Sequence, residues 1–205
     1  MKISLEQVGK KFQRHWIFRN IDFTFSHSQS YALLGANGSG KSTLMRLLAG
    51  MQTPSAGKIF HEAAGKIVEE GKLFPLISLC APGMELIDEM TLSEFLAFHF
   101  SHKKTLQGLS VEDITGLTGL NAFADKPIGE YSSGMKQRVK LAQAIFADTS
   151  ILLLDEPCTN LDEAGVLQYR EWIENYTSGR LVVVASNDPR EYFFCQERLV
   201  MSDWK

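Results

Sequence analysis

No hydrophobic run in the sequence of 205 residues is long enough to cross a lipid bilayer. The longest aliphatic runs, at residues 151–154 and 181–185, fall far short of the ~20 apolar residues that a membrane-spanning helix needs. Residues 1–6 also lack the apolar stretch that is typical of a signal peptide. We therefore expect a chain that is neither secreted nor embedded in a membrane, and that works in the cytoplasm.

Cysteine is scarce. The three cysteines, Cys80, Cys158 and Cys195, lie far apart, and no two of them have the close spacing of a zinc site or a redox motif. We expect reduced thiols, as is usual for a cytoplasmic protein.

An excess of positive charge is also absent. The 21 lysines and arginines and the 24 aspartates and glutamates give a net charge of −3. A nucleic-acid-binding domain normally shows the opposite balance, so we expect no nucleic-acid partner. With 44% hydrophobic and 22% charged residues, the composition is that of a folded protein and not of a disordered chain. A chain of this length buries about 70% of its surface, which fits a single domain.

Buried strands alternate with helices in the second half of the sequence. The aliphatic runs at 151–154 and 181–185 flank an amphipathic helical pattern at 163–176, and apolar residues recur at helical spacing from Gly134 onward. This alternation predicts an α/β fold with a mostly parallel sheet.

Two regions depart from that pattern. The first thirty residues contain short alternating segments that predict an antiparallel β subdomain. Residues 84–130 are predicted to form a mostly helical insert, in which a capping box, Thr91-Leu-Ser-Glu94, begins one helix. We expect one domain over residues 1–205. The short alternating segments lie at residues 3–8, 16–18 and 21–25.

A phosphate-binding loop follows the apolar run at 31–34. Its pattern is Gly-x-x-x-x-Gly-Lys-Ser, and a helical segment follows directly. Glycines let backbone amides converge on phosphate oxygens, and the helix N-terminus adds the positive end of its dipole. An incidental glycine-rich turn is the alternative, but the strand–loop–helix context argues against it. The expected nucleotide-binding residues are Gly35, Asn37, Gly38, Ser39, Gly40, Lys41, Ser42 and Thr43.

The residue types in this loop suggest distinct roles. Lys41 is suited to reach the β- and γ-phosphates and Ser42 to hold Mg²⁺. The strand at 151–154 delivers Asp155 and Glu156 at its carboxyl end, where ligands bind in open α/β sheets. Asp155 suits the Mg²⁺ shell, and Glu156 is placed to act as general base toward an attacking water. For the acidic pair alone, a solvated turn is the alternative interpretation.

A third motif, Glu130-Tyr-Ser-Ser-Gly-Met-Lys-Gln-Arg138, precedes the acidic strand and begins a helix. Ser132, Ser133 and Gly134 place hydroxyls and free amides at a helix start, which suits an anion, although Ser132 also reads as an ordinary N-cap. With this motif the chain resembles the nucleotide-binding subunits of ATP-binding-cassette (ABC) transporters, whose signature is usually Leu-Ser-Gly-Gly-Gln. The resemblance covers essentially the whole chain, in the same order of motifs.

The resemblance implies an ATPase that uses ATP and Mg²⁺ and works as a pair of ATP-binding subunits, here a homodimer. Each ATP would lie between the phosphate-binding loop of one subunit and Ser132, Ser133 and Gly134 of the other. A separate transmembrane permease subunit would be the partner, with the ATPase peripheral on the inner face of the cell membrane. Adenine would stack on Phe12, with Trp16 as the competing ring.

Two positions depart from the family pattern. Ala81 or Pro82 stands where the family has a glutamine that contacts Mg²⁺ or water. Asn187 stands where a histidine normally contacts the γ-phosphate. Asparagine can donate a hydrogen bond but cannot carry a positive charge or move a proton. With Lys41, Glu156 and Asn187 as the expected catalytic residues, we predict slow hydrolysis.

Other interpretations remain open at this stage. A soluble ABC-type ATPase that remodels a partner, or a weakly hydrolysing nucleotide switch, would fit the same motifs without a membrane partner. His99 and His102, and the pair Lys103-Lys104, are expected to be solvated. The aromatic residues of the helix near 92–100 suit either core packing or a docking surface for the permease. Asn160-Leu-Asp162 resembles the family segment that crosses the dimer interface and reads equally as a helix cap.

Overall fold

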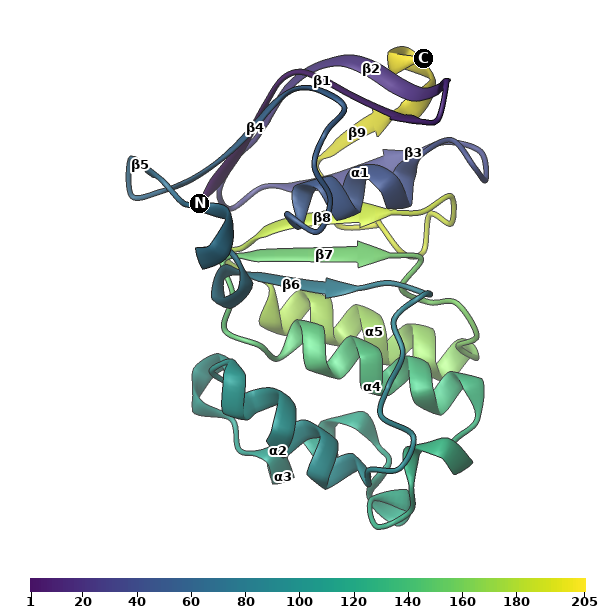
Figure 1. Ribbon diagram of the computed structural model, residues 1–205. Coiled ribbons are helices and arrows are strands. Elements are labelled where there is room, and N and C mark those ends of the chain that lie inside the picture. The colour runs from purple at the N-terminus through teal and green to yellow at the C-terminus, as the bar shows by residue number, and fades with distance from the viewer.

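An antiparallel sheet, a parallel sheet and a group of helices are stacked in the computed structural model (Figure 1). The structure describes the backbone of residues 1–205 and every side chain except that of Glu70. The parallel sheet lies in the middle of the molecule, between the antiparallel sheet and helices α2 to α5. The helices are α1 (Lys41–Leu48), α2 (Leu92–His102), α3 (Val111–Thr118), α4 (Ser133–Ile145) and α5 (Glu163–Tyr176).

The parallel sheet has the strand order β6-β7-β8-β3-β9, and each neighbouring pair is parallel. Its central strands β7 and β8 are buried along their whole length, as expected for aliphatic strands covered on both faces. The mostly parallel sheet predicted from the sequence is therefore confirmed. The strands are β3 (Ser30–Leu34), β6 (Ile77–Cys80), β7 (Ile151–Asp155), β8 (Leu181–Ala185) and β9 (Glu197–Val200).

Alternate side chains of these strands enter two different cores. Leu152 and Leu154 of β7 pack in the core that contains residues of α2, α4 and α5. Ile151 and Leu153 pack in the second core, with residues of α1 and of the antiparallel sheet. The parallel sheet thus lies between the two cores. Packing on both of its faces fixes the position of its carboxyl edge.

The antiparallel sheet has the order β2-β1-β4-β5. The sequence patterns predicted several short strands here, but the structure has two strands of eleven residues each, β1 and β2. Between Ile21 and Phe18 of β2 the pairing register with β1 shifts, and Asn20 in this stretch has a left-handed φ of 56°. Such a bulge reverses the alternation of side chains, so one strand reads as two fragments. The strands are β1 (Lys2–Phe12), β2 (His15–Phe25), β4 (Ala56–Ala63) and β5 (Lys66–Ile67).

Between β6 and α4 the described elements are helical. The expected capping box is present: the Thr91 side chain accepts a hydrogen bond from the Glu94 amide, and Glu94 caps the Thr91 amide in return. None of the helices in the described part of the chain combines the length and the apolar character that crossing a membrane requires. Short 3-10 helices lie at Glu70–Lys72, Phe74–Leu76, Leu106–Gly108, Asn121–Phe123, Ile128–Glu130 and Met201–Trp204.

Candidate nucleotide site

The phosphate-binding loop connects the end of β3 to the start of α1, as the sequence predicts. Gly38 and Gly40 have φ values of 77° and 105°, which favour glycine. A Cβ atom on Gly40 would lie 2.5 Å from Ile17 Cγ2 and 3.0 Å from Phe18 Cδ1. The loop therefore folds tightly against β2, and only glycine fits at this point.

Lys41 lies inside this loop. Its side chain is buried, and Nζ donates a hydrogen bond to the carbonyl of Gly35 at 2.5 Å. A buried ammonium at the N-terminus of a helix gives the pocket a positive interior suited to an anion. The pocket is lined by Ile17, Asn37, Gly38, Ser39, Gly40, Lys41, Ser42, Thr43 and Glu156.

Asp155 lies next to Ser42, one of the residues that line the pocket. Asp155 is 4% exposed, and the Ser42 hydroxyl donates a hydrogen bond to its carboxylate. Burial, and secondarily the nearby charge of Glu156, raises the pKa of Asp155. Its Oδ1 atom has no hydrogen-bond partner among the described residues. An orphan carboxylate oxygen beside a hydroxyl is the donor set that Mg²⁺ prefers, so Ser42 and Asp155 fit that ion.

Glu156 follows directly at the carboxyl end of β7. Its φ of 47° is left-handed, a conformation that costs about 1–2 kcal/mol for a residue other than glycine. The following residue is Pro157, which normally pushes its predecessor toward extended backbone. The Glu156 amide donates to the Ala185 carbonyl at 2.9 Å, which holds the turn against β8. The side chain lines both the phosphate-loop pocket and the hollow beside it.

The loop after β8 brings Asn187 to the same place. Asn187 Oδ1 accepts a hydrogen bond from the Gly35 amide at 3.2 Å, and the residue lines a hollow together with Asn37 and Glu156. That bond assigns the orientation of the amide and turns its NH₂ group toward other acceptors. The structure thus brings together the three residues predicted to be catalytic, Lys41, Glu156 and Asn187.

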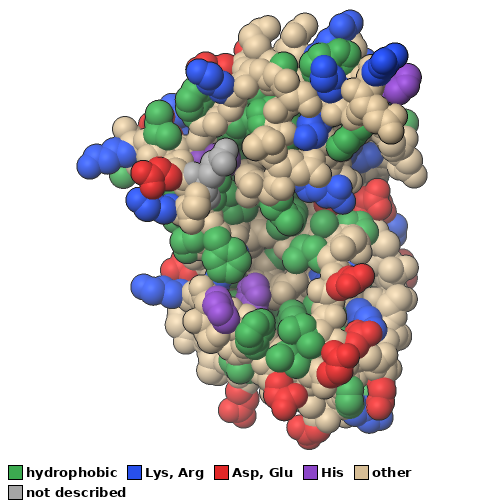
Figure 2. Space-filling view, in the orientation of Figure 1, with side chains coloured by type: hydrophobic (Ala, Val, Ile, Leu, Met, Phe, Trp, Pro, Cys, Tyr) green, Lys and Arg blue, Asp and Glu red, His purple; other side chains and the backbone are tan. Residues whose placement is uncertain are grey.

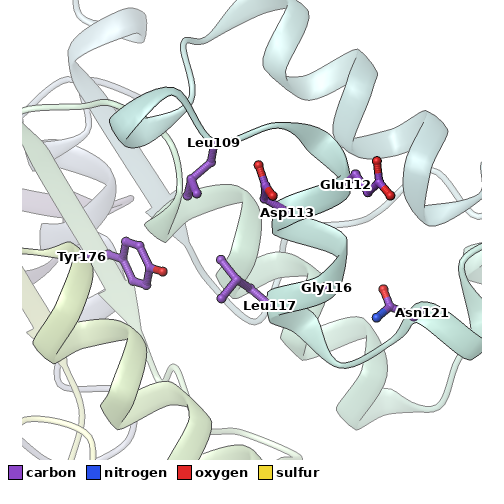
Figure 3. Close-up of a pocket in the computed structure, with 7 residues that line it drawn as sticks. All are labelled: Leu109, Glu112, Asp113, Gly116, Leu117, Asn121 and Tyr176. Atoms are coloured by element: carbon purple, nitrogen blue, oxygen red, sulfur yellow. The ribbon is translucent and has the colours of Figure 1, made fainter.

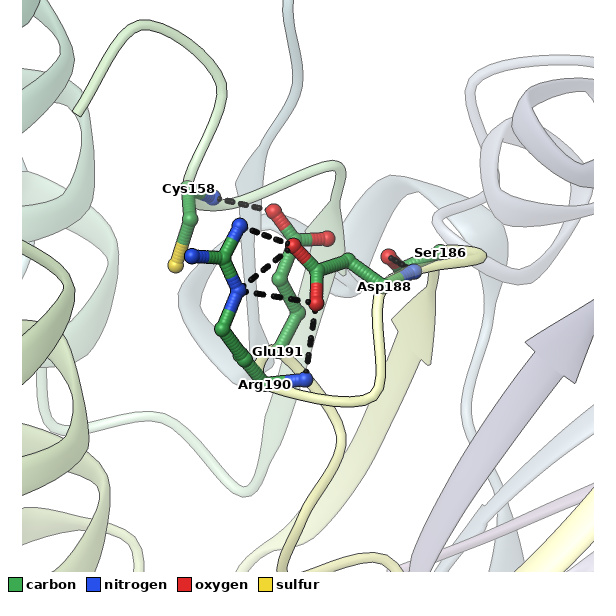
Figure 4. A network of polar contacts seen from close by, with 5 residues as sticks. All are labelled: Cys158, Ser186, Asp188, Arg190 and Glu191. Atoms are coloured by element: carbon green, nitrogen blue, oxygen red, sulfur yellow. Dashed lines mark hydrogen bonds and ion pairs between the residues drawn. The ribbon is translucent and has the colours of Figure 1, made fainter. Parts of the chain in front are cut away.

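Sequence reasoning missed a polar network beside this site (Figure 4). Glu191 is 5% exposed, and its Oε1 accepts a hydrogen bond from the Cys158 amide at 2.7 Å. Burial raises the pKa of Glu191. In the same loop, Arg190 forms an exposed ion pair with Asp188 at 2.6 Å. No sequence signal distinguished Glu191, because an acid in Asp-Pro-Arg-Glu reads as part of a solvated turn.

The signature residues lie at the start of α4. Ser132 is an N-cap, and its Oγ accepts from the Met135 amide at 3.2 Å. Ser133 is exposed. A Cβ atom on Gly134 would lie 2.9 Å from the carbonyl oxygen of Asn160, so α4 touches the segment that follows Glu156. Ser132, Ser133 and Gly134 do not line the phosphate-loop pocket of their own chain.

The helix-cap interpretation of the segment 160–162 is confirmed for one of its residues. Asp162 is the N-cap of α5, where its carboxylate accepts from the Gly165 amide at 2.8 Å. The same carboxylate forms an ion pair with Arg138 of α4 at 3.3 Å. The segment is therefore joined to the signature helix by a side-chain contact as well as by the close approach of Gly134.

Two aromatic rings at the turn between β1 and β2 are exposed. Phe12 is 48% and Trp16 42% exposed, and Lys10 and Lys11 lie over their respective rings. The Trp16 ring covers Gly9, where a Cβ atom would approach it to 2.9 Å. Neither ring lines the phosphate-loop pocket, so both remain candidates for stacking on adenine.

A groove separates the parallel sheet from α2. Figure 2 shows hydrophobic side chains together with histidines in the middle of this face. Lys103 Nζ donates to the Ile77 carbonyl at 2.5 Å and lies 4.5 Å from the centre of the Phe74 ring. Burial lowers the pKa of Lys103 to about 8. The groove is lined by Ala49, Met51, Phe74, Ile77, Ser78, Leu79, Met84, His99, Lys103, Gln143 and Ala144.

The sequence predicted that both histidines and both lysines near the end of α2 are solvated, and this prediction is wrong for one residue of each pair. His102 and Lys104 are exposed, but His99 and Lys103 are partly buried in the groove. Burial, with Lys103 as the second cause, lowers the pKa of His99 to about 4. The aromatic strip divides in the same way: Phe95 is buried in the core and Phe98 is 49% exposed.

A second hollow lies between α3 and the end of α5 (Figure 3). The described residues around it include two carboxylates, Glu112 and Asp113, and no lysine or arginine. Asp113 is already engaged in the cap of α3 with Ser110. This hollow does not suit a phosphate, in contrast to the pocket around Lys41.

Comparisons with known proteins agree with the geometry. Residues 18–159 match the sequence model of a family described as ABC transporter. The chain is 36% identical over 171 residues to the uncharacterized ABC transporter ATP-binding protein YxlF of Bacillus subtilis, covering 80% of this chain and 55% of that protein. It is 30% identical over 190 residues to the lantibiotic transport ATP-binding protein SrtF of Streptococcus pyogenes, covering 90% of this chain and 79% of that protein. The chain thus spans about half of the first relative and most of the second.

The fold is also that of a solved structure. A putative ABC transporter ATP-binding protein from Pyrococcus furiosus matches with a TM-score of 0.82 and 20% sequence identity, over 100% of both chains. At this identity the likeness concerns the fold alone. It confirms the predicted architecture, a phosphate-loop α/β core with an antiparallel β subdomain.

Proposed function

The chain belongs to the ABC transporter family, and we propose that it is the ATP-binding and ATP-hydrolysing subunit of a transporter whose membrane-spanning permease is a separate chain. One observation supports this most strongly: the phosphate-loop lysine and Glu156 line one pocket, and the buried Asp155, with its orphan oxygen, is hydrogen-bonded to Ser42 of the same pocket. Residues 1–205 would form one ATP-binding cassette, with residues 84–130 as its helical insert.

The residues in and near the pocket have different roles in ATP hydrolysis. Lys41 and the loop amides would bind the β- and γ-phosphates, and Ser42 and Asp155 would hold Mg²⁺, which when bound would offset phosphate charge. Glu156 accepts the proton of the attacking water. Asn187 donates a hydrogen bond to the γ-phosphate while its oxygen stays on the Gly35 amide. Phe12 stacks on the adenine, with Trp16 as the alternative ring.

Two copies would complete each nucleotide site. Ser133 is exposed at a helix N-terminus, a position suited to the γ-phosphate of a nucleotide held by another chain. A two-fold pair places the Ser132–Gly134 segment of each copy over the phosphate loop of the other. ATP then stabilises the pair, and hydrolysis releases it.

The groove between the parallel sheet and α2 is our candidate docking surface for the permease. Most of the residues that line the groove are apolar. Among the described lining residues, the charged side chain is that of Lys103, and none is acidic. We expect an apolar segment of a permease loop that presents a carboxylate to Lys103. The subunit would then lie on the cytoplasmic face of the membrane.

Slow turnover is part of the proposal. Ala81 and Pro82 follow β6 and offer no side-chain amide for Mg²⁺ or water. Asn187 adds a donor but no positive charge. The loss of one charge-assisted contact costs about 3 kcal/mol of transition-state stabilisation on the scale of single oxyanion donors.

Phosphate release from the purified protein tests the enzymatic part. We expect Glu156→Gln to abolish release while ATP still binds, because the amide cannot take a proton. Glu163→Gln is the matched control, since Glu163 is an exposed acid at the start of α5. Equal rates for wild type and Glu156→Gln would overturn the assignment.

Co-purification from detergent-solubilised membranes tests the transporter part. We expect Phe74→Ala and Lys103→Ala to weaken recovery with a multi-span membrane protein. Leu167→Ala, an exposed apolar residue on α5, should have no effect. A protein that stays in the soluble fraction regardless of these changes would contradict the membrane partnership.

A further inference from the structure

The loop after β8 contacts two separate parts of the nucleotide site. At its start, Asn187 accepts a hydrogen bond from the first residue of the phosphate loop, Gly35. At its end, the Glu191 carboxylate accepts one from the Cys158 amide, two residues beyond Glu156 (Figure 4). One short segment therefore spans from the phosphate-binding residues to the turn that carries the proposed general base.

Glu191 is built into this position. Its carboxylate accepts from the Cys158 amide at 2.7 Å and also from the Ser186 hydroxyl. Its own carbonyl accepts from the Tyr169 hydroxyl of α5 at 2.6 Å, and its amide donates to the Asp188 carbonyl at 3.0 Å. With 5% exposure, the side chain is held between the loops after β7 and β8, and the backbone of Glu191 is bonded to α5.

The turn that Glu191 holds needs support. Glu156 has a left-handed φ of 47° and precedes a proline, so its conformation persists only if the surroundings impose it. Three hydrogen bonds fix the turn from different sides. They run from the Glu156 amide to Ala185 O (2.9 Å), from Gln137 Nε2 to Pro157 O (2.7 Å), and from the Cys158 amide to Glu191 Oε1 (2.7 Å).

We propose that Glu191 is a positioning residue: by accepting the Cys158 amide, its carboxylate holds the strained turn that points Glu156 at the γ-phosphate. It also joins that turn to the segment carrying Asn187, so that base and phosphate-binding residues keep a fixed separation. This role rests on the proposed ATPase function of Glu156.

The rest of the loop does not share this role. Asp188 and Arg190 pair with each other at the surface, and the Arg190 side chain is 63% exposed. An exposed pair contributes little to holding a backbone. Glu191 is the described residue of the loop whose side chain bonds to the backbone of the Glu156 turn.

Two substitutions distinguish a positioning role of the Glu191 side chain from a chemical role of its carboxylate. In Glu191→Gln, the side-chain oxygen can still accept the Cys158 amide, and the new NH₂ group can donate to Ser186 Oγ. In Glu191→Ala, the Cys158 amide stays buried without its partner. Glu197→Ala, at an exposed acid on β9, removes the same charge elsewhere and serves as control.

Hydrogen–deuterium exchange of the protein without nucleotide is the primary measurement, because it does not depend on ATPase activity. We expect Glu191→Ala to speed exchange in peptides covering residues 156–161 by at least about tenfold, since local protection follows the stability of local hydrogen bonds. Glu191→Gln and Glu197→Ala should exchange like wild type. Equal protection in Glu191→Ala, or equal loss in Glu191→Gln, would overturn the proposal.

The second measurement compares kcat with nucleotide affinity. We expect Glu191→Ala to lower kcat about 10–100-fold and to change the Kd of a fluorescent ATP analogue less than about threefold, because the phosphate loop is untouched. Glu191→Gln should restore kcat to within about threefold of wild type. A Kd that rises as much as kcat falls, or a Gln variant as slow as Ala, would contradict positioning. A wild-type protein without turnover would instead refute the ATPase proposal, while the exchange result would still stand.

Discussion

Replacing Gly134 by alanine tests the contact between the signature helix and the segment after Glu156. A Cβ atom at this position would lie 2.9 Å from the carbonyl oxygen of Asn160, whereas ordinary contacts begin at 3.4 Å. The carbonyl must therefore retreat by about 0.5 Å. It has little freedom to do so, because Asn160 has a left-handed φ of 65° and Asp162, two residues on, caps α5.

The structure supplies the expected magnitude and a matched control. Overpacking of this kind costs about 1–3 kcal/mol of unfolding free energy, which outweighs the gain of alanine over glycine in a helix. In Gly116→Ala, a Cβ atom on α3 meets nothing within 4 Å, so this variant should gain about 0.5–1 kcal/mol. For a chain of this size, in which 1 kcal/mol shifts the melting temperature by about 2–4 °C, the two melting temperatures should differ by about 2–12 °C.

Thermal unfolding and ATP hydrolysis of the two variants are the assays. We expect Gly134→Ala to melt below wild type and to lose about tenfold in turnover, because misplacement by ~1 Å costs about 100-fold and the shift here is smaller. Gly116→Ala should melt at or above wild-type temperature with unchanged turnover. If Gly134→Ala matched Gly116→Ala in both assays, the close approach of α4 to Asn160 would be refuted.

Four further predictions concern the pocket and the groove. Lys41→Ala should raise the Kd of ATP at least about tenfold in a fluorescence titration, and unchanged affinity would contradict its role. Phe12→Ala should weaken ATP binding by about 1 kcal/mol or more, and a larger effect of Trp16→Ala would reassign the adenine platform. Asn187→His should raise kcat, because a protonatable donor replaces a neutral one. A slower variant would show that losing the hydrogen bond between Asn187 and Gly35 lowers kcat more than the new donor raises it. His99 has a pKa of about 4 in the folded chain against 6.5 when unperturbed. As the pH falls, His99 therefore takes up its proton at a higher pH in the unfolded state than in the folded state. Stability should therefore fall as the pH drops from 6.5 toward 4, by up to about 1.4 kcal/mol per pH unit, and urea denaturation of His99→Gln should lack this component.

The fold was largely predictable because its signals are local. Aliphatic strands such as the one predicted at residues 151–154 and the Thr91 capping box depend on neighbouring residues, and the structure has both where the sequence predicts them. Strand β2 was fragmented in the prediction because the irregularity at Asn20 reverses the side-chain alternation. Pairing across the sheet maintains the strand through that irregularity, and a single sequence does not display the pairing.

The candidate site was predictable where a motif encodes it. The phosphate loop and the acids after β7 were expected together, and they line or adjoin one pocket. Glu191 and Gln137 were not expected, because their importance lies in hydrogen bonds to backbone atoms far away in the sequence. His99 and Lys103 were misjudged for a related reason: charge predicts solvation, and only the packing of α2 beside Phe74 shows their burial.

The central claim is that each ATP is bound by two chains, and mixing two inactive variants tests it directly. Lys41→Ala removes the phosphate-loop lysine, and Ser133→Glu places a negative charge where the γ-phosphate of the other chain's nucleotide would lie. Glutamate is tolerated at a helix N-terminus, so the second variant should fold. In a one-to-one mixture, half of the dimers combine the two variants, and each mixed dimer has one site in which both residues are intact.

Phosphate release from that mixture is the decisive measurement. The account predicts that each variant alone is inactive and that the mixture recovers about a quarter of the wild-type rate, because half of the dimers carry one working site of two. A mixture as inactive as its components, or a Ser133→Glu variant with full activity of its own, would show that one chain holds the nucleotide unaided and would contradict the account.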